Sequence, residues 1–322
     1  MYKTISASTR TTKARRLVLV DSERRALPNS LRDHPGLAEL LARPGFRGEP
    51  GEVAAGSDGA MVVGVGPRED LGPEVLRKVG AGLVRALHRM DVKKVEFDLR
   101  AMPRIPLGGE AIGRALGEGI GIANWRMDLF DGAASRQPPA SGRLVLGCES
   151  GDLHAGLKLG LLLADAVNLA RRMAATPPNV CTPAHVASTA RTLARSREEL
   201  HCSVITYQKA RQLGMGGLEN VGKGSANKPC MIMLDWKPAK CGSKERLVMV
   251  GKTITFDTGG YTMKSGSGMK GMKYDKNGGM AVLGAMKSIA EARLPVRVTA
   301  LLPAAENMVS SSAYRPDDII EM

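Results

Sequence analysis

The sequence predicts an α/β protein of two domains, the second of them a sheet covered by helices on both faces. Strand-like apolar runs alternate with helical periods from His154 onward. A chain of 322 residues with 43% hydrophobic residues is long enough for two domains and apolar enough for their cores. A Gly-, Ser- and Pro-containing stretch, residues 132–142, separates the halves. We therefore place the domains at residues 1–140 and 150–322.

The first half is expected to form one compact α/β unit. Strand-like runs lie at Leu17–Val20, Ala60–Val65 and Val92–Leu99, and a helical period covers Pro73–Arg89. The first twenty residues contain no acid and five basic residues, a composition shared by organellar transit peptides and disordered basic tails. Because a strand begins at Arg16, little room remains for a removable leader, and we favour the basic tail.

The second half begins with a long helix near His154. This helix ends before Pro177, because the residue that precedes a proline is disfavoured in a helix. A second helix is expected over about Pro183–Leu200. The further expected elements are strands at Ser203–Thr206, Met231–Trp236, Leu247–Val250 and Val296–Leu302, and helices at Gln208–Leu213 and Gly278–Ala292.

Apolar runs and cysteines indicate a cytoplasmic protein without a membrane span. The longest apolar run, Leu159–Ala164, is ended by Asp165, far short of the ~20 residues that cross a bilayer. The five cysteines are odd in number and contain no Cys-x-x-Cys pair, which favours reduced thiols over a disulfide frame or a zinc site.

The net charge of +14 leaves two interpretations open. A strongly basic chain is typical of a nucleic-acid partner. The alternative, which we favour, is that lysines and arginines are scattered over both domains, because the sequence shows no helix-turn-helix, zinc finger or basic-aromatic pattern.

The residues with the strongest chemical signal lie between Val250 and Met280. Lys252 and Asp257 follow the strand-like run that ends at Val250, and open α/β sheets hold their ligands at the carboxyl ends of strands. Lys264 follows the pair Gly259-Gly260, and Asp275 precedes Gly278-Gly279. Carboxylate oxygens suit hard divalent cations, and a lysine joins them only when its amine is neutral.

Each of these residues also has an ordinary structural interpretation. Asp257 could be a turn residue before glycines, Asp275 a helix N-cap, and Lys264 a solvated loop lysine. A phosphate-binding loop at Gly251-Lys252-Thr253 is disfavoured, because position 246 is arginine where that motif needs glycine.

Taken together, the stretch resembles the first signature of the leucyl (cytosol) aminopeptidase family. The resemblance extends in order over roughly residues 155–322, through Thr176-Pro-Pro-Asn-Val-Cys-Thr-Pro183, Gly214-Met-Gly-Gly-Leu, Ala305-Glu-Asn-Met308 and Ala313-Tyr-Arg-Pro316. It implies that Lys252, Asp257 and Asp275 are metal ligands and that Lys264 is the catalytic lysine.

The resemblance also implies the setting of this site. Family members hold two divalent metal ions, Mn²⁺ or Zn²⁺, with bicarbonate as a further group, and they act on peptide substrates. They form hexamers in the cytoplasm. The fold implied is an N-terminal macro-like α/β domain that aids assembly, followed by a mixed-sheet α/β/α metallopeptidase domain.

The family's second signature, Asn-Thr-Asp-Ala-Glu-Gly-Arg, is absent from the 322 residues. By the resemblance it follows Met322 by about a dozen residues and supplies two further carboxylates and the arginine that holds the bicarbonate. Asp317, Asp318 and Glu321 lack its spacing and are not substitutes. We therefore expect a catalytic domain that is incomplete at its C-terminus and inactive alone. The alternative is a non-catalytic remnant that retains assembly or DNA binding.

Two expectations concern residues beside this site. Lys276 places a cation next to Asp275 and weakens metal binding unless its side chain points away. Glu306 and Arg315 are expected to form a structural ion pair rather than a catalytic acid and base.

Overall fold

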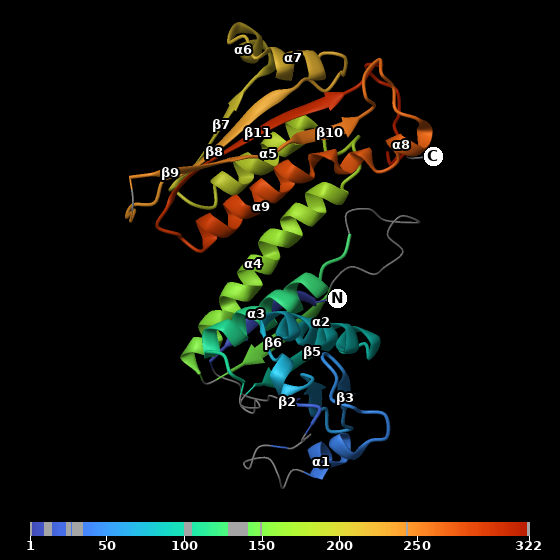
Figure 1. The fold of residues 1–322 in the computed structure, drawn as a ribbon, viewed down its shortest axis with the longest axis vertical. Coiled ribbons are helices and arrows are strands. Elements are labelled where there is room, and N and C mark those ends of the chain that lie inside the picture. The colour runs from blue at the N-terminus through green and yellow to red at the C-terminus, as the bar shows by residue number, and fades with distance from the viewer. Residues whose placement is uncertain are drawn as a thin grey trace. The chain divides into compact units, whose positions relative to one another are not determined.

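The computed structural model of the protein describes residues 2–9, 15–23, 27, 35–99, 105–127, 141–148, 150–242 and 244–320. The chain divides into two compact units, Met1–Asp165 and Ala166–Met322, and the boundary falls within helix α4 (Gly151–Ala175) (Figure 1). Of the connection expected at residues 132–142, residues 132–140 lie outside the described part of the chain. The domain limits 1–140 and 150–322 stay a prediction.

The first unit contains a six-stranded sheet in the order β1-β6-β5-β2-β4-β3. Strand β3 runs antiparallel to β4, and the other pairs are parallel. The elements are β1 (Tyr2–Ser8), β2 (Arg15–Val20), α1 (Pro35–Ala42), β3 (Val53–Ala55), β4 (Met61–Gly64), α2 (Pro73–Arg89), β5 (Lys94–Asp98), α3 (Gly109–Ala123) and β6 (Gly142–Gly147). The three predicted strands and the predicted helix of this half are therefore confirmed.

The expectation of a disordered N-terminal tail is wrong for Tyr2–Ser8, which forms strand β1 beside β6. Tyr2 is buried, and its hydroxyl donates to the carbonyl of Val92 at 2.6 Å. Tyr2 also exchanges two hydrogen bonds with the Asn124 side chain, at 3.0 and 2.8 Å. The basic composition concealed this strand, because Tyr2 is the one buried residue among its seven and leaves no apolar run to recognise.

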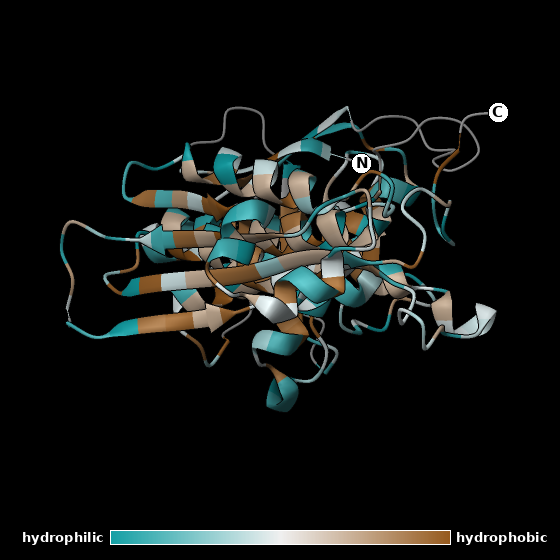
Figure 2. Cartoon of the chain, turned by 90° about the horizontal axis from the view of Figure 1, so that it is seen from above, coloured by the Kyte–Doolittle hydropathy of each residue, from teal (hydrophilic) through white to brown (hydrophobic). Residues whose placement is uncertain are grey.

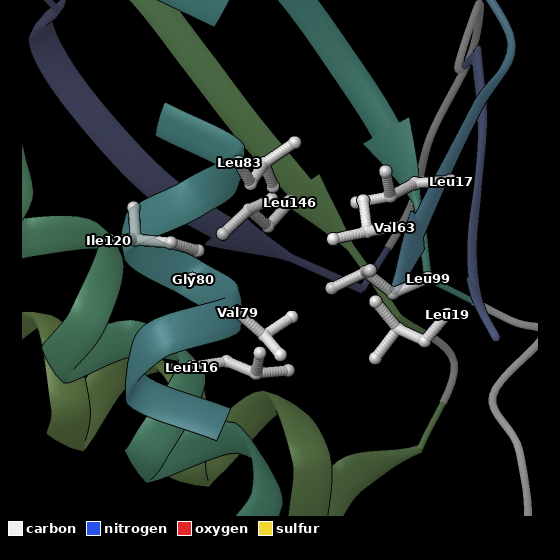
Figure 3. A pocket seen from close by; sticks show the side chains of 10 residues that line it. All are labelled: Leu17, Leu19, Val63, Val79, Gly80, Leu83, Leu99, Leu116, Ile120 and Leu146. Atoms are coloured by element: carbon white, nitrogen blue, oxygen red, sulfur yellow. The ribbon is translucent and has the colours of Figure 1, made fainter. Parts of the chain in front are cut away.

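The core of the first unit lies between its sheet and helices α2 and α3. Figure 3 shows a small void there, surrounded by side chains from both layers. Its volume of about 10 Å³ is barely enough for one water molecule, and every lining residue is apolar. The lining residues are Leu17, Leu19, Val63, Val79, Gly80, Leu83, Leu99, Leu116, Ile120 and Leu146. Such a void is a packing defect of a dry core.

The second unit contains a five-stranded mixed sheet in the order β10-β11-β8-β7, with β9 also paired to β11. Strands β9 and β10 run parallel to β11, whereas β8 is antiparallel to both β11 and β7. The elements are α5 (Pro183–Ala194), β7 (Leu200–Ile205), α6 (Tyr207–Gln212), α7 (Gly216–Gly222), β8 (Cys230–Trp236), β9 (Arg246–Val250), β10 (Thr253–Asp257), α8 (Gly266–Met269), η4 (Met272–Lys276), α9 (Asn277–Glu291) and β11 (Arg297–Asn307).

Helices cover both faces of this sheet, as predicted. Helices α5 and α9 enclose the main core against one face, and α6 and α7 lie on the other (Figure 1). Figure 2 shows strands that are largely hydrophobic, with hydrophilic residues on the outer helices and loops. One predicted element is too long: the helix from Pro183 ends at Ala194, because residues 195–199 turn and Leu200 begins β7.

Helix α4 has 25 residues and is, by length and composition alone, apolar enough to cross a membrane. The core helix of a soluble protein meets the same criterion. Leu153 and Leu157 of α4 belong to the core of the first unit, and Met173 belongs to the core of the second. This packing accounts for the buried leucines and methionine of the helix, whereas the leucines at residues 161–163 are half-buried and Val167 is exposed.

A break between β9 and β10 brings the sheet close to helix α9. Both strands keep one offset against β11, since Val250 pairs with Leu301 and Thr253 with Ala304. At the break, the Lys252 carbonyl accepts a hydrogen bond from Gly279 N at 2.7 Å. A β-carbon on Gly251 would lie 2.6 Å from the Cα of Gly279, so the approach requires glycine. The close contact fixes Lys252 beside the start of α9.

We expect Gly251→Ala to destabilise the second unit by at least about 1–3 kcal/mol, because backbone on both sides must move. Gly217→Ala is the matched control: a β-carbon there meets nothing within 4 Å, and the residue lies inside α7. Alanine at position 217 should leave stability unchanged or raise it by about 0.4–1 kcal/mol. Urea unfolding of both variants measures the difference, and equal stabilities would refute the close-contact account.

Strand β9 exposes apolar side chains: Leu247, Val248 and Val250 are 56%, 52% and 68% exposed. An apolar pocket of about 510 Å³ adjoins it, and Val250, Lys252 and Ile254 line that pocket together with residues of α7. In the described part of the chain β9 pairs with β11 alone. Exposed apolar strands of this kind promote association, so we expect limited solubility.

Candidate metal centre

Two carboxylates and two lysines gather where β10 ends and α9 begins. Lys252 lies in the β9–β10 break, and Asp257 is the last residue of β10. Lys264 follows in the next loop, and Asp275 lies in η4, a short 3₁₀ turn before α9. Nζ of Lys252 is 2.6 Å from Oδ1 of Asp275, and Nζ of Lys264 is 2.8 Å from Oδ2 of Asp257. Each predicted carboxylate ligand is thus paired with one predicted lysine.

The carboxylate of Asp257 is held by three donors. Oδ1 accepts from Gly259 N at 2.9 Å and from Asn307 Nδ2 at 2.7 Å, and Oδ2 accepts from Lys264. Gly259 has a φ of 88°, a left-handed conformation that brings its amide back to the carboxylate. Burial raises the pKa of Asp257, but the hydrogen bonds from Lys264, Gly259 and Asn307 outweigh it and hold the pKa below its usual value. Asp257 is therefore ionised and oriented.

Asn307 has no assigned role in the sequence interpretation. It ends β11, and the pairing of β10 with β11 sets it opposite Asp257. The register of the two strands shifts between Ile254 and Asp257, which marks a local irregularity. A polar residue at the carboxyl end of the neighbouring parallel strand was the available signal.

Asp275 has one carboxylate oxygen without a partner. Oδ1 accepts from Lys252, whereas Oδ2 is buried and has no hydrogen-bond partner. Buried polar atoms are normally satisfied, so an orphaned anionic oxygen indicates a missing cation, water or donor. Within the described residues no group of three or more His, Cys, Asp and Glu residues could hold a metal. The chemistry of the site, two carboxylates with a free oxygen, nevertheless fits a hard divalent cation.

Lys264 is the more enclosed of the two lysines, with its side chain 31% exposed against 62% for Lys252. The hydrogen bond to Asp257 raises the pKa of Lys264, and the charge of Asp275 adds to the increase. Its ammonium therefore remains charged within the field of both carboxylates.

The Lys276 side chain points away from the site. It is fully buried, and its amine donates to the carbonyls of Thr176, at 3.2 Å, and Lys273. Thr176 directly follows α4, so the cation lies at the negative end of that helix. The sequence predicts that Lys276 weakens metal binding unless its side chain points away from Asp275. The Lys276 amine bonds to these two carbonyls, and Asp275 bonds to Lys252 instead.

Burial also makes Lys276 a source of pH-dependent stability. Burial lowers the Lys276 pKa from 10.5 to about 8. Between these two pH values the unfolded chain binds more protons at this lysine, so the Lys276 contribution to the free energy of unfolding rises with pH. Burial raises the pKa of Cys181 and Cys230 to about 11, so the stability from these thiols is lost as pH rises from 9 to 11. We expect the stability of metal-free wild type relative to Lys276→Met to rise by about 1 kcal/mol between pH 8 and 9, because both proteins keep the two thiols and only wild type has the buried lysine. Urea unfolding at each pH tests this, and identical pH profiles of the two proteins would contradict it.

Glu306 and Arg315 form the expected ion pair. Ser225 and Asn227 also donate to the buried Glu306 carboxylate, and the Arg315 Nε is 3.1 Å from Asp318. With its oxygens occupied in this way, Glu306 serves as an anchor for the segment around Arg315.

Fold and site together define a two-unit α/β protein with a carboxylate–lysine centre at the carboxyl end of a mixed sheet. Sequence comparison gives the family. The profile of the N-terminal domain of the cytosol aminopeptidase family matches residues 32–131, and that of its catalytic domain matches residues 168–322. The chain belongs to the cytosol aminopeptidase family, and its predicted fold class is confirmed.

Curated relatives agree with this assignment. A probable cytosol aminopeptidase of Aquifex aeolicus is 36% identical over 282 residues, which are 86% of this chain and 56% of the relative. One from Xylella fastidiosa is 33% identical over 294 residues, which are 88% of this chain and 59% of the relative. The chain spans somewhat more than half the length of these relatives.

Two solved structures share the fold. The bottromycin maturation enzyme BotP in complex with Mn has a TM-score of 0.74 at 29% identity, over 93% of this chain and 61% of that one. A mutant of tomato leucine aminopeptidase has a TM-score of 0.77 at 22% identity, over 98% of this chain and 65% of that one. The tomato enzyme supports the fold alone, whereas the BotP complex shows a related chain with manganese.

Proposed function

We propose that this chain carries part of the active site of a two-metal aminopeptidase, which releases N-terminal residues from peptides in the cytoplasm. The observation that carries the proposal is the pairing of Asp257 and Asp275 with lysines, beside a buried carboxylate oxygen that has no partner. Family membership supplies the reaction class. The same membership supports a homo-oligomer, a hexamer, as the assembled form.

Lys252, Asp257 and Asp275 would hold one divalent cation, Mn²⁺ or Zn²⁺, and the complete site would hold two. A bound divalent cation polarises the substrate carbonyl and activates water. For Lys252 to join the ligands, its amine must be neutral and must give up its hydrogen bond to Asp275.

The other residues orient and stabilise. Asn307 and Gly259 fix the Asp257 carboxylate, so that its oxygens keep one orientation. Lys264 remains an ammonium and would donate to the substrate carbonyl oxygen as negative charge develops there. That role excludes Lys264 from the ligands, because a charged ammonium has no lone pair to donate.

We further propose that residues 1–322 alone turn over peptides slowly or not at all. The described residues bring two carboxylates to the centre, whereas a two-metal site needs more negative charge to hold both cations. Bicarbonate would need an arginine that the centre lacks among the described residues. The second candidate, a non-catalytic role in assembly or DNA binding, is supported by the net charge of +14.

Titration of metal-free protein with Mn²⁺, followed by electron paramagnetic resonance, tests the proposal. We expect saturable binding near one ion per chain and displacement of Mn²⁺ by Zn²⁺. Absence of saturable Mn²⁺ binding would refute the proposed metal centre and favour the second candidate, the non-catalytic role.

A further inference from the structure

The turn that carries Asp275 is held by a neighbouring turn. Residues 315–318 form that second turn, closed by the hydrogen bond from Asp318 N to the Arg315 carbonyl at 3.1 Å. Pro316 and Asp317 are its central residues, and Asp317 has a φ of 72°. Glycine is favoured at a central position with positive φ, and an aspartate there is strained relative to glycine.

The Asp317 carboxylate bonds to both ends of the segment that leads to Asp275. Oδ2 accepts from Gly271 N at 3.2 Å, and Oδ1 lies 3.2 Å from the Lys273 ammonium. Gly271 caps η4, and Lys273 lies within it, two residues before Asp275. Asp317 therefore keeps a strained backbone conformation and makes two side-chain bonds to η4, which a glycine at that position could not make.

The second turn is itself anchored. Asp318 accepts from Asn179 N at 3.1 Å and from Arg315, and Arg315 pairs with the buried Glu306. The Asn179 side chain donates to the Ile319 carbonyl at 2.7 Å. The turn that carries Asp317 is thus attached to strand β11 through Glu306 and to the segment before α5 through Asn179, and from there Asp317 contacts η4.

We propose that Asp317 is a positioning residue that holds η4, and with it Asp275, in the geometry for metal binding. The inference rests on the proposed function, in which Asp275 is a ligand. Residues that orient ligands typically change metal affinity by about 10–100-fold when they are removed.

Three variants test the role. Asp317→Gly removes the carboxylate and keeps the left-handed backbone without strain. Asp317→Asn keeps an oxygen for Gly271 N and also tolerates positive φ. Asp91→Gly is the matched control, because Asp91 also has a positive φ, 52°, and pairs with a lysine, Lys93, in the first unit.

The first readout is hydrogen exchange of the backbone amides of residues 271–276 in metal-free protein, and the second is the dissociation constant for Mn²⁺. In Asp317→Gly we expect exchange to rise about 10-fold and the dissociation constant to rise at least about 10-fold, with no fall in unfolding temperature. Asp317→Asn should stay within about threefold of wild type in affinity, and Asp91→Gly should match wild type in both readouts.

Unchanged exchange in Asp317→Gly would overturn the inference, and so would raised exchange with unchanged Mn²⁺ affinity. If wild-type protein binds no Mn²⁺, the proposed function fails. The exchange measurement then still decides separately whether Asp317 holds the turn.

Discussion

Asp275→Asn is expected to lower the affinity of the chain for Mn²⁺ by at least about 100-fold. The substitution replaces one carboxylate oxygen by an amide nitrogen and removes the negative charge that the buried, unpartnered Oδ2 shares. An amide is a poorer ligand for a hard cation than a carboxylate. It also leaves the Lys252 ammonium beside a neutral group, which adds repulsion toward an incoming cation. Isothermal titration of metal-free protein at fixed ionic strength measures the change.

Glu291→Gln is the matched control for this variant. Glu291 lies at the end of α9 in the same unit and pairs with Lys287, as Asp275 pairs with Lys252. Loss of a partly exposed pair of this kind costs about 0–1 kcal/mol of stability and should leave metal affinity unchanged. Equal Mn²⁺ affinities for Asp275→Asn and wild type would show that Asp275 is not a ligand.

The second large effect concerns catalysis. We expect residues 1–322 to hydrolyse a leucine anilide at least ~10²-fold more slowly than a chimaera that continues into the C-terminal region of a full-length family member with the signature Asn-Thr-Asp-Ala-Glu-Gly-Arg. By the proposed function, the added carboxylates would complete the second metal position and the added arginine would complete the anion site. We also expect the chimaera to be more soluble, with its added region covering apolar side chains of β9 that are exposed in residues 1–322.

The comparison separates three accounts. A fast chimaera and a slow 1–322 chain support an incomplete site, whereas two slow proteins support a non-catalytic role. Metal-loaded 1–322 with a rate close to that of the chimaera would show that the added signature is unnecessary. Glu306, Asp318 or a neighbouring subunit would then have to supply the missing ligands.

The sequence predicted most strands of the second unit, because β8, β9 and β11 are nearly continuous apolar runs. The predicted helix over Gly278–Ala292 differs by one residue at each end from α9. Strand β10 was not predicted, because Thr253 and Thr255 interrupt its apolar pattern although both are fully buried. In the first half β1 and α3 were missed, since glycines and basic residues obscure their periods.

The candidate site shows the same division. The sequence pattern selected Lys252, Asp257, Lys264 and Asp275, and the structure pairs them. Asn307 and Asp317 act through contacts that pattern alone could not supply: one depends on the register of two parallel strands, and the other on a turn 46 residues away from Gly271. Such contacts depend on tertiary packing, which local sequence does not encode.

A crystal structure of the protein soaked in Mn²⁺, with the ion located by its anomalous scattering, tests the central claim most directly. We expect one strong peak with the Asp257 and Asp275 carboxylates and the Lys252 amine in its first coordination shell, and with the Lys264 ammonium nearby but not bound to it. A Mn²⁺ peak elsewhere, or any of the three ligand side chains more than ~6 Å from the ion, would contradict the metal centre.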